Sequence, residues 1–208
     1  MSNKKSQYKI IILGESGIGK TSFITRIIGN DFQEEQISTI GIDFFMLNKI
    51  DNNGNKIALK LYDTSGQEAY KSMAINILRT IDAVIFMYDI TNQKTFNNLE
   101  EKWFKVNDIV DLKSIVLCLV GNKNELIDNR EVSYEEGENL AKKYNMAFFE
   151  VSVKNNSNIE EVISSVANNI VDKFGYKGEE NEKGKEKKFS IKLSDNDKPN
   201  KKKRKLLC

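Results

Sequence analysis

Apolar residues in the first 175 positions occur in two patterns, short continuous runs and longer segments with helical spacing. The continuous runs have the length of buried strands, whereas apolar residues recurring every three or four positions are typical of amphipathic helices. The expected strands are Tyr8–Leu13, Lys56–Tyr62, Ala83–Tyr88, Ile115–Gly121 and Ala147–Val151. The expected helices are Ser22–Gly29, Glu68–Arg79, Gln93–Val110, Ser133–Tyr144 and Ile159–Phe174. This alternation predicts an α/β fold, an open and mostly parallel sheet with helices on both faces.

One further strand, Ile42–Ile50, breaks the strict alternation. Only the polar segment Asp51–Asn55 separates it from Lys56–Tyr62. A connection this short joins antiparallel strands, because a parallel pair needs a crossover of a dozen or more residues. We therefore expect a six-stranded, mostly parallel sheet with one antiparallel strand at its edge.

From residue 176 onward the apolar pattern stops, and the segment 176–208 is rich in Lys, Glu, Asn and Ser. It holds 12 of the 32 Lys and Arg residues but only 6 of the 30 Asp and Glu residues, so its net charge is +6 and that of the rest is −4. We predict a flexible N-terminus over residues 1–7, one domain over 8–175 and a disordered basic tail over 176–208. The charge distribution argues against a nucleic-acid surface on the domain and favours contact of the basic tail with an anionic partner, either a membrane or a nucleic acid.

Composition excludes several classes of protein. The chain has no histidine and only two cysteines, Cys118 and Cys208, which predicts neither a zinc site nor a disulfide framework and fits a reducing cytosol. The longest apolar runs are far shorter than the ~20 residues that span a bilayer. The first residues lack the apolar region of a signal peptide, and Ser2 stands where N-myristoylation needs glycine.

The segment Gly14–Thr21, Gly-Glu-Ser-Gly-Ile-Gly-Lys-Thr, follows the first expected strand and precedes the first expected helix. It has the form G-x-x-x-x-G-K-[ST], in which backbone N–H groups and a helix N-terminus surround phosphate oxygens. The expected phosphate-binding residues here are Gly14, Glu15, Ser16, Gly17, Ile18, Gly19, Lys20, Thr21 and Ser22. Lys20 would reach the outer phosphates and Thr21 would bind Mg²⁺. The alternative is a glycine-containing turn without a ligand.

Polar segments also follow three of the other expected strands. In a doubly wound sheet, ligands bind at the carboxyl ends of the strands. Asp63 comes after one strand and is suited to hold Mg²⁺ through water, while Gly66 could offer its N–H to a terminal phosphate and Gln67 could orient a water molecule. Gly121–Glu125 and Ser152–Lys154 follow the last two strands, where a nucleobase would lie.

In this order and at this spacing, the phosphate loop, Asp63–Glu68, Gly121–Glu125 and Ser152–Lys154 resemble the Ras superfamily of small GTPases, which have the P-loop NTPase fold. Thr39–Phe44 is similar to the signature of the Rab branch, as is Tyr88-Asp89-Ile90-Thr91. The resemblance covers residues 8–174. It implies a switch that binds and hydrolyses GTP and regulates vesicle and membrane traffic, with Mg²⁺ and GTP or GDP bound.

The resemblance also assigns roles to individual residues. It implies that Thr21 and Thr39 bind Mg²⁺ with Asp63 behind the water shell of the metal, and that Gln67 positions the attacking water. The implied base and ribose site consists of Phe32, Asn122, Lys123, Glu125, Ser152, Val153 and Lys154. For Phe32 the alternative is simple packing against the first helix. For Thr39 and Asp63 it is a turn residue and a helix cap.

Four features depart from the family pattern. Glu125 replaces an Asp that accepts hydrogen bonds from guanine, and Gln36 replaces a Tyr that closes over the γ-phosphate. The aromatic cluster that faces effector proteins keeps Phe44, but Tyr62 stands for a tryptophan and Ile77 for an aromatic residue. The chain ends in a single cysteine, Cys208, after a basic run, which predicts one prenyl group; the alternative is a soluble basic tail resembling a nuclear-localisation sequence.

The resemblance implies a monomer that does not bind nucleic acid. Its implied partners are effector proteins, an exchange factor, an activating protein, the prenylation and extraction machinery and an anionic membrane surface. No arginine is placed to act as an internal finger, so slow intrinsic hydrolysis is expected. We expect the protein on the cytoplasmic face of a membrane, cycling with the cytosol. Two alternatives stay open, a nucleotide-binding scaffold with little GTPase activity and a P-loop kinase or ATPase.

Overall fold

A computed structural model describes residues 6–33, 39, 41–64, 77–104 and 111–176. Its strands are β1 (Ser6–Leu13), β2 (Ile42–Ile50), β3 (Lys56–Thr64), β4 (Ala83–Asp89), β5 (Val116–Asn122) and β6 (Ala147–Val151). Its α-helices are α1 (Lys20–Ile27), α3 (Gln93–Asn98), α4 (Tyr134–Lys143) and α5 (Ile159–Phe174). A π-helical turn, Leu99–Trp103, continues α3, and short 3₁₀ turns lie at Leu112–Ser114 and Ile127–Asn129.

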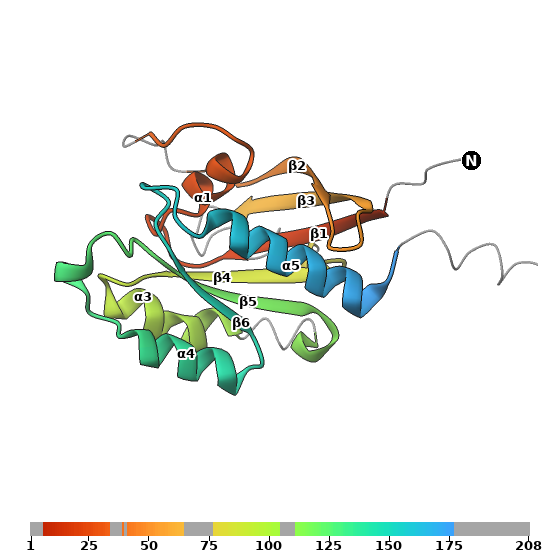
Figure 1. The fold of residues 1–208 in the computed structure, drawn as a ribbon. Coiled ribbons are helices and arrows are strands. Elements are labelled where there is room, and N and C mark those ends of the chain that lie inside the picture. The colour runs from red at the N-terminus through yellow and green to blue at the C-terminus, as the bar shows by residue number, and fades with distance from the viewer. Residues whose placement is uncertain (1–5, 34–38, 40, 65–76, 105–110, 177–208) are drawn as a thin grey trace, which may run out of the picture. The chain divides into compact units, whose positions relative to one another are not determined.

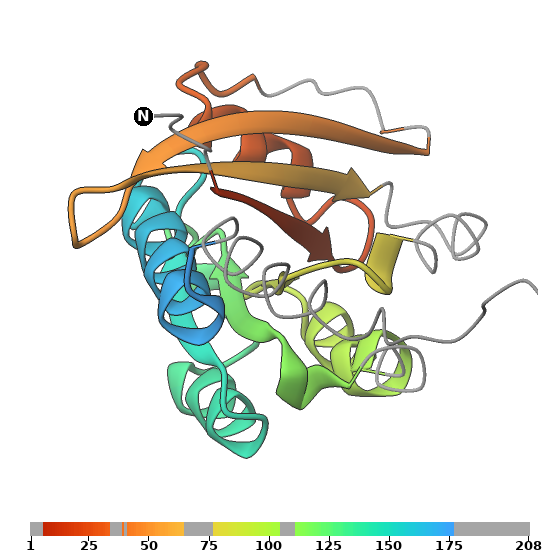
Figure 2. The same ribbon diagram turned by 90° about the vertical axis from the view of Figure 1, so that its right-hand side faces the viewer.

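The six strands form one sheet in the order β2-β3-β1-β4-β5-β6. Strands β2 and β3 pair antiparallel in a hairpin, with Ile42 opposite Thr64 and Ile50 opposite Lys56. The other neighbouring strands pair in parallel. The predicted mixed sheet with its antiparallel edge strand is therefore confirmed, and both faces carry helices (Figures 1 and 2).

Two apolar cores flank the sheet. On one face, Phe23 and Ile24 of α1 and the apolar stripe of α5 pack against β1, β3 and β4. On the other, Leu99 and Phe104 pack with Leu140 of α4 against alternate residues of the same sheet. Every residue of β4 and of β5 is buried, because both of their faces are covered by helices. β2 alternates between half-buried and exposed residues along most of its length, as an edge strand covered on one face does.

Two predicted helices are described only in part. Of Glu68–Arg79, the structure describes residues 77–79, with Ile77 and Leu78 helical. The helix expected over Gln93–Val110 begins at Gln93 as predicted, but its hydrogen bonding changes to the π type at Leu99. Residues 105–110 and the tail 177–208 lie outside the described residues. Within the described part of the chain, no helix has the length and apolar character needed to cross a bilayer.

Candidate functional site

The candidate site residues lie in loops that follow the carboxyl ends of the strands. The loop Gly14–Gly19 leaves β1 and runs directly into α1. Gly14 has φ of 151°, and a Cβ there would lie 2.4 Å from the carbonyl oxygen of Met87. Gly19 has φ of 96°, and a Cβ there would lie 2.5 Å from Nδ2 of Asn122. Only glycine fits at these two positions, so the motif is required for the path of the loop.

The first turn of α1 is open to an anion. Gly19 occupies the N-cap position, no side chain caps the helix, and its first turn contains no acidic residue. The first N–H groups of a helix have no partner within the helix, and its N-terminus carries partial positive charge. The loop and this helix end therefore provide the donors that a phosphate chain requires.

Lys20 is the first residue of α1, and its charge is partly desolvated. The residue is 5% exposed, and its Nζ donates hydrogen bonds to the carbonyl oxygens of Gly14 at 3.0 Å and Glu15 at 2.7 Å. Burial lowers the pKa of Lys20 to about 8, although the negative charges of Asp63 and Glu15 raise it. Carbonyl oxygens are weaker partners for an ammonium group than phosphate oxygens are, so the residue is suited to bind the outer phosphates.

Oxygen atoms from three separate segments meet beside the loop. Thr21 Oγ1 lies 2.8 Å from Thr39 Oγ1 and donates to Asp63 Oδ2 at 2.6 Å. Thr39 Oγ1 donates to the same Asp63 oxygen at 3.1 Å. Asp63 is 1% exposed, and its other oxygen, Oδ1, is buried without a hydrogen-bond partner among the described residues.

Burial raises the pKa of Asp63, while the hydroxyls of Thr21 and Thr39 and the charge of Lys20 oppose the shift. Hydroxyl and carboxylate oxygens are the ligands that Mg²⁺ prefers. The donor set therefore fits the magnesium ion that the sequence predicted. Among the described residues there is no cluster of three or more His, Cys, Asp or Glu that would indicate a different metal site.

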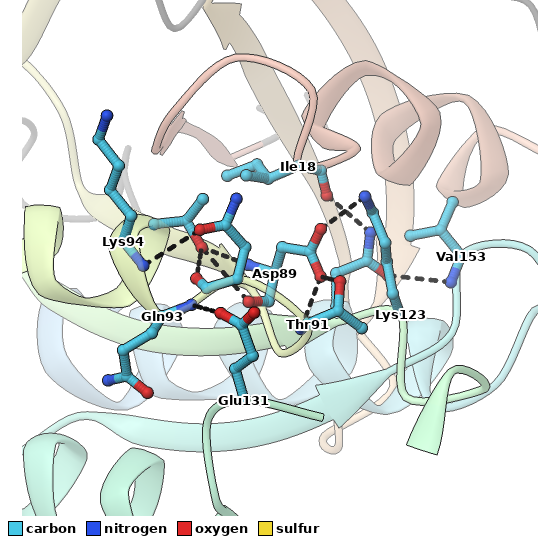
Figure 3. Close-up of polar contacts among 11 residues, drawn as sticks. Ile18, Asp89, Thr91, Gln93, Lys94, Lys123, Glu131 and Val153 are labelled. Atoms are coloured by element: carbon cyan, nitrogen blue, oxygen red, sulfur yellow. Dashed lines mark hydrogen bonds and ion pairs between the residues drawn. The ribbon is translucent and has the colours of Figure 1, made fainter. Parts of the chain in front are cut away.

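Asn122, the last residue of β5, connects two of the loops. Its Nδ2 donates to the carbonyl oxygen of Ile18 at 2.8 Å, and its Oδ1 accepts from the backbone N–H of Val153 at 3.2 Å (Figure 3). The phosphate loop is thus hydrogen-bonded, through one side chain, to the loop after β6. The role of Asn122 in binding a base stays a prediction.

Lys123 is fixed by a carboxylate that the sequence analysis did not assign to the site. Its φ is 71°, and its Nζ lies 2.6 Å from Oδ2 of Asp89 at the end of β4 (Figure 3). The other oxygen of Asp89 accepts from the N–H of Thr91 at 2.9 Å and from its hydroxyl at 2.7 Å. These contacts orient the lysine side chain. The only sequence signal was that Tyr88–Thr91 is part of the Rab signature.

Glu125 lies in the turn after Lys123 and is half-buried. Its Oε2 is buried and has no hydrogen-bond partner in the described part of the chain. The turn is held by the N–H of Asn124, which donates to the carbonyl oxygen of Val151 at 3.1 Å. A buried carboxylate oxygen without a partner is unfavourable, and N–H donors of a bound base would satisfy it.

The loop after β6 is anchored to α1 by Arg26, which the sequence analysis also missed. Its Nε donates to the carbonyl oxygen of Val153 at 3.1 Å and its Nη2 to that of Lys154 at 2.9 Å. Ser152 is buried, and its hydroxyl accepts from the N–H of Asn155 at 2.9 Å. Hydrogen bonds therefore fix the backbone of Ser152–Lys154 beside Asn122, and the role of this loop in binding a base stays a prediction.

A third missed contact involves the side chain of Glu15. Its Oε1 accepts from Nδ2 of Asn98 at 3.2 Å and lies 3.4 Å from Nζ of Lys102. Asn98 ends α3 and Lys102 lies in the π-helical turn, so the phosphate loop is also linked to this helix. The motif predicted only the backbone of Glu15 as a phosphate donor.

Phe32 is half-buried and packs against the core beneath α1 and α5. This position agrees with the packing alternative, and its role beside a base stays a prediction. Three of the other predicted residues, Gly66, Gln67 and Cys208, and the atypical Gln36 lie outside the described residues. The site that the structure describes therefore comprises the phosphate loop, the oxygen cluster and the base-side loops.

Comparison with known proteins identifies the family. The model of the Ras family matches residues 9–172, which is most of the domain. The chain belongs to the Ras family. Proteins of this family bind guanine nucleotide with Mg²⁺ and hydrolyse GTP.

Similar proteins include several from the Rab group. The chain is 36% identical to Ras-related protein Rab-1 of Theileria annulata, over 80% of this chain and 75% of that protein. It is 37% identical to Ras-related protein Rab-13 of Bos taurus, over 81% of this chain and 82% of that protein. It is 38% identical to Ras-related protein SEC4 of Saccharomyces cerevisiae, over 80% of this chain and 76% of that protein. The predicted kinship with Rab proteins is thereby confirmed.

Proposed function

We propose that this protein is a GTP-binding and GTP-hydrolysing switch that regulates vesicle and membrane traffic by recruiting effector proteins in one nucleotide state. The observation that carries the proposal is the meeting of Thr21, Thr39 and Asp63 beside the phosphate loop. These three residues are far apart in sequence, and each of them would respond to a metal-bound triphosphate. Thr39 precedes β2 and Asp63 lies near the end of β3, so the site adjoins the end of the hairpin that is opposite its turn.

The residues of the site divide the chemistry among them. The loop N–H groups and the N-terminus of α1 bind the phosphate chain, and Lys20 neutralises its outer charge. Thr21, Thr39 and Asp63 would hold Mg²⁺, Asp63 through water, and the ion would supply further neutralisation of that charge. Gln67 orients the attacking water, and Gly66 donates its N–H to the γ-phosphate.

Base recognition falls to the loops after β5 and β6. The carboxylate of Glu125 accepts hydrogen bonds from the N1–H and the amino group of guanine. Adenine has an acceptor at N1 and no amino group beside it, so it cannot make these bonds. Asn122 and Lys123 hold the loop and cover the ring, and Ser152–Lys154 forms the neighbouring wall. The orphaned oxygen of Glu125 supports this assignment because it provides a buried acceptor without a donor.

The proposed partners are proteins that distinguish or interconvert the GTP-bound and GDP-bound states. Release of Thr39 and Gly66 after hydrolysis changes the surface around them, so effectors distinguish the states. An exchange factor replaces GDP by GTP, and an activating protein accelerates hydrolysis by ~10³–10⁵. The described part of the effector surface includes Phe44, Tyr62 and Ile77, of which Phe44 is 57% exposed.

Membrane attachment depends on the end of the chain. Cys208 follows the basic run Lys201–Lys205 and two leucines, and one prenyl chain together with a polybasic segment gives stable anchoring to an anionic leaflet. Mass spectrometry of the C-terminal peptide from the native protein tests this point. A free thiol on Cys208 would contradict it.

The central experiment is to purify the chain, identify the nucleotide that co-purifies and follow phosphate release. We expect bound GDP or GTP, and slow hydrolysis that is reduced further in the Gln67→Leu variant. An empty site at micromolar protein, or hydrolysis unaffected by Gln67→Leu, would contradict the proposal. Adenine nucleotide in the site would contradict the role given to Glu125.

A further inference from the structure

One face of the β2–β3 hairpin carries exposed apolar residues. Strand β2 is at the edge of the sheet (Figure 2), and its alternate residues Phe45 and Leu47 pack against the core beneath α1 and α5. The opposite face of β2 presents Phe44, Met46 and Ile50, which are 57%, 48% and 64% exposed, and the polar Asn48 lies between Met46 and Ile50. Several large exposed apolar side chains on one face of a strand indicate a binding surface.

A lysine lies among these apolar side chains. Lys60 of β3 stands directly opposite Met46 in the hairpin register, and Tyr62 stands opposite Phe44. The Nζ of Lys60 lies 3.9 Å from the ring centroid of Phe44 and 5.0 Å from that of Tyr62. The ammonium group therefore rests on two aromatic rings, and no carboxylate among the described residues pairs with it.

The charges around these apolar side chains have one sign. Opposite residues of neighbouring strands share a face of the sheet, so the register places Lys56 beside Ile50 and Lys9 of β1 beside Lys60. Alternate positions of β2, β3 and β1 on this face include no Asp or Glu in the described strands. The face is thus apolar and cationic without an acidic residue of its own.

We propose that this face, defined by Phe44, Met46, Ile50, Lys60 and Tyr62, binds a protein segment that presents an Asp or Glu carboxylate between apolar side chains. The carboxylate pairs with Lys60, and the apolar side chains cover the rings and Met46. The inference extends the proposed function, because an effector or regulator of the switch would carry this segment. What the structure adds is the acidic anchor, because a partner that covers this face would bury the ammonium of Lys60, and a buried charge is costly unless it is paired.

Two other occupants fit the charges less well. A second copy of this chain would bring its own Lys60, Lys56 and Lys9 to the contact, and like charges would face each other. A bilayer has its anionic groups at the surface and its apolar chains beneath them. A protein surface that binds a bilayer would therefore have lysines around the rim of a protruding apolar centre. Here the ammonium of Lys60 lies between the apolar side chains and not at their rim. This position suits a single carboxylate that lies among the apolar residues of a protein interface.

The test is a selection of a phage-displayed random peptide library against the full chain, loaded in parallel with GDP and with a non-hydrolysable GTP analogue. We expect enriched peptides with Asp or Glu flanked by large apolar residues. The same selection against Lys60→Gln should lose the acidic preference. The control is Lys94→Gln, which removes one exposed lysine on α3, away from this face. Selection against this variant should still enrich acidic peptides.

Exchanging the charges of Lys60 and of the peptide's acidic residue tests whether the two groups pair, and distinguishes pairing from a structural effect of the substitution. Replacing the acidic residue of a selected peptide by Lys should weaken its binding to the natural chain by about 10-fold or more, the scale of a charged hydrogen bond. The Lys60→Glu variant should restore binding of that altered peptide. Equal thermal midpoints of the variants, measured without peptide, establish that the sheet is intact.

Three results would overturn the inference. They are the absence of any enriched peptide, enrichment without an acidic residue, and an acidic preference that persists in Lys60→Gln. Vesicles of phosphatidylcholine and phosphatidylserine are measured alongside, and Lys60-dependent binding to them without peptide binding would assign the face to lipid. Phosphate release is assayed on the same preparations, so a chain that selects acidic peptides but does not hydrolyse GTP would refute the proposed function alone.

Discussion

The side-chain amide of Asn122 donates a 2.8 Å hydrogen bond to the carbonyl oxygen of Ile18, and so joins the end of β5 to the phosphate loop. The same side chain accepts from the N–H of Val153. The part of the site that would contact phosphate and the part that would contact the base are therefore mechanically connected through one buried residue.

The Asn122→Ala variant removes both bonds and leaves two buried backbone groups without partners. We expect the free energy of unfolding to fall by about 1–3 kcal/mol, and guanine-nucleotide affinity to fall with it. Chemical denaturation and nucleotide titration measure the two effects. Asn169→Ala, an exposed asparagine on α5, is the control and should change neither; equal behaviour of the two variants would contradict the connection.

The hydroxyl of Thr21 should be needed for Mg²⁺ and not for folding. In Thr21→Ala the contacts to Thr39 and Asp63 are lost, so we expect nucleotide to dissociate about 10-fold faster or more at millimolar Mg²⁺, with little further change when the metal is chelated. Thr21→Ser keeps a hydroxyl and serves as the matched control. Stopped-flow release of a fluorescent GDP analogue measures both rates, and wild-type metal dependence in Thr21→Ala would disprove the assignment.

Glu125→Asp should tighten guanine-nucleotide binding. The family pattern has Asp at this position, and Glu125 carries the same carboxylate on a side chain that is one methylene longer. If a shorter side chain restores both hydrogen bonds to the base, the dissociation constant for GDP should fall by about 10-fold, with no gain for ADP. Isothermal titration calorimetry decides the point, and an unchanged constant for GDP would show that Glu125 already binds guanine well.

Tyr176 should stabilise the hairpin turn against the end of α5. Its hydroxyl donates to Asp51 and accepts from Nδ2 of Asn55 at 2.6 Å and of Asn53 at 3.3 Å. Burial of Asp51 opposes ionisation, but the hydrogen bonds from Tyr176, Asn55 and Asn53 outweigh it and lower its pKa. Tyr176→Phe should reduce the free energy of unfolding by about 1 kcal/mol at neutral pH.

The effect of Tyr176→Phe on stability should depend on pH. A carboxyl whose pKa is lower in the folded than in the unfolded chain stabilises the fold above the unfolded pKa, which is about 4 for Asp. That contribution is lost as the pH falls through the folded pKa, so Tyr176→Phe should show a shallower loss of stability below about pH 4. Tyr134→Phe, in which the tyrosine is exposed, is the control and should follow the natural chain across the same range.

Sequence patterns found the fold because the determining signals are local. The buried runs of β4 and β5, the apolar spacing of α5 and the short connection Asp51–Asn55 each reflect the environment of one element. The phosphate loop is equally local, since Gly14 and Gly19 occupy backbone conformations that other residues rarely adopt. These features allowed the sheet, its antiparallel edge and the position of the loop to be predicted without tertiary information.

Contacts between distant segments were not predictable in the same way. Arg26 reaches the carbonyl oxygens of Val153 and Lys154, and Lys123 pairs with Asp89, although nothing next to these residues in the sequence marks them as partners. Which arginine or aspartate becomes a partner depends on how α1 packs on the sheet and on the order of the strands. The hydrophobic pattern specifies that a helix packs, but not which polar groups at its margin then face each other.

The sequence by itself determined the strands, the phosphate loop and the family of this protein, because hydrophobic periodicity and glycine conformation act within a few residues. Only the tertiary structure decided that Asn122 joins the phosphate loop to the base side, that Glu125 holds a carboxylate oxygen without a partner, and that Lys60 lies on the rings of Phe44 and Tyr62. These relationships arise from the register and packing of whole elements, which bring side chains far apart in the chain to within a few ångströms.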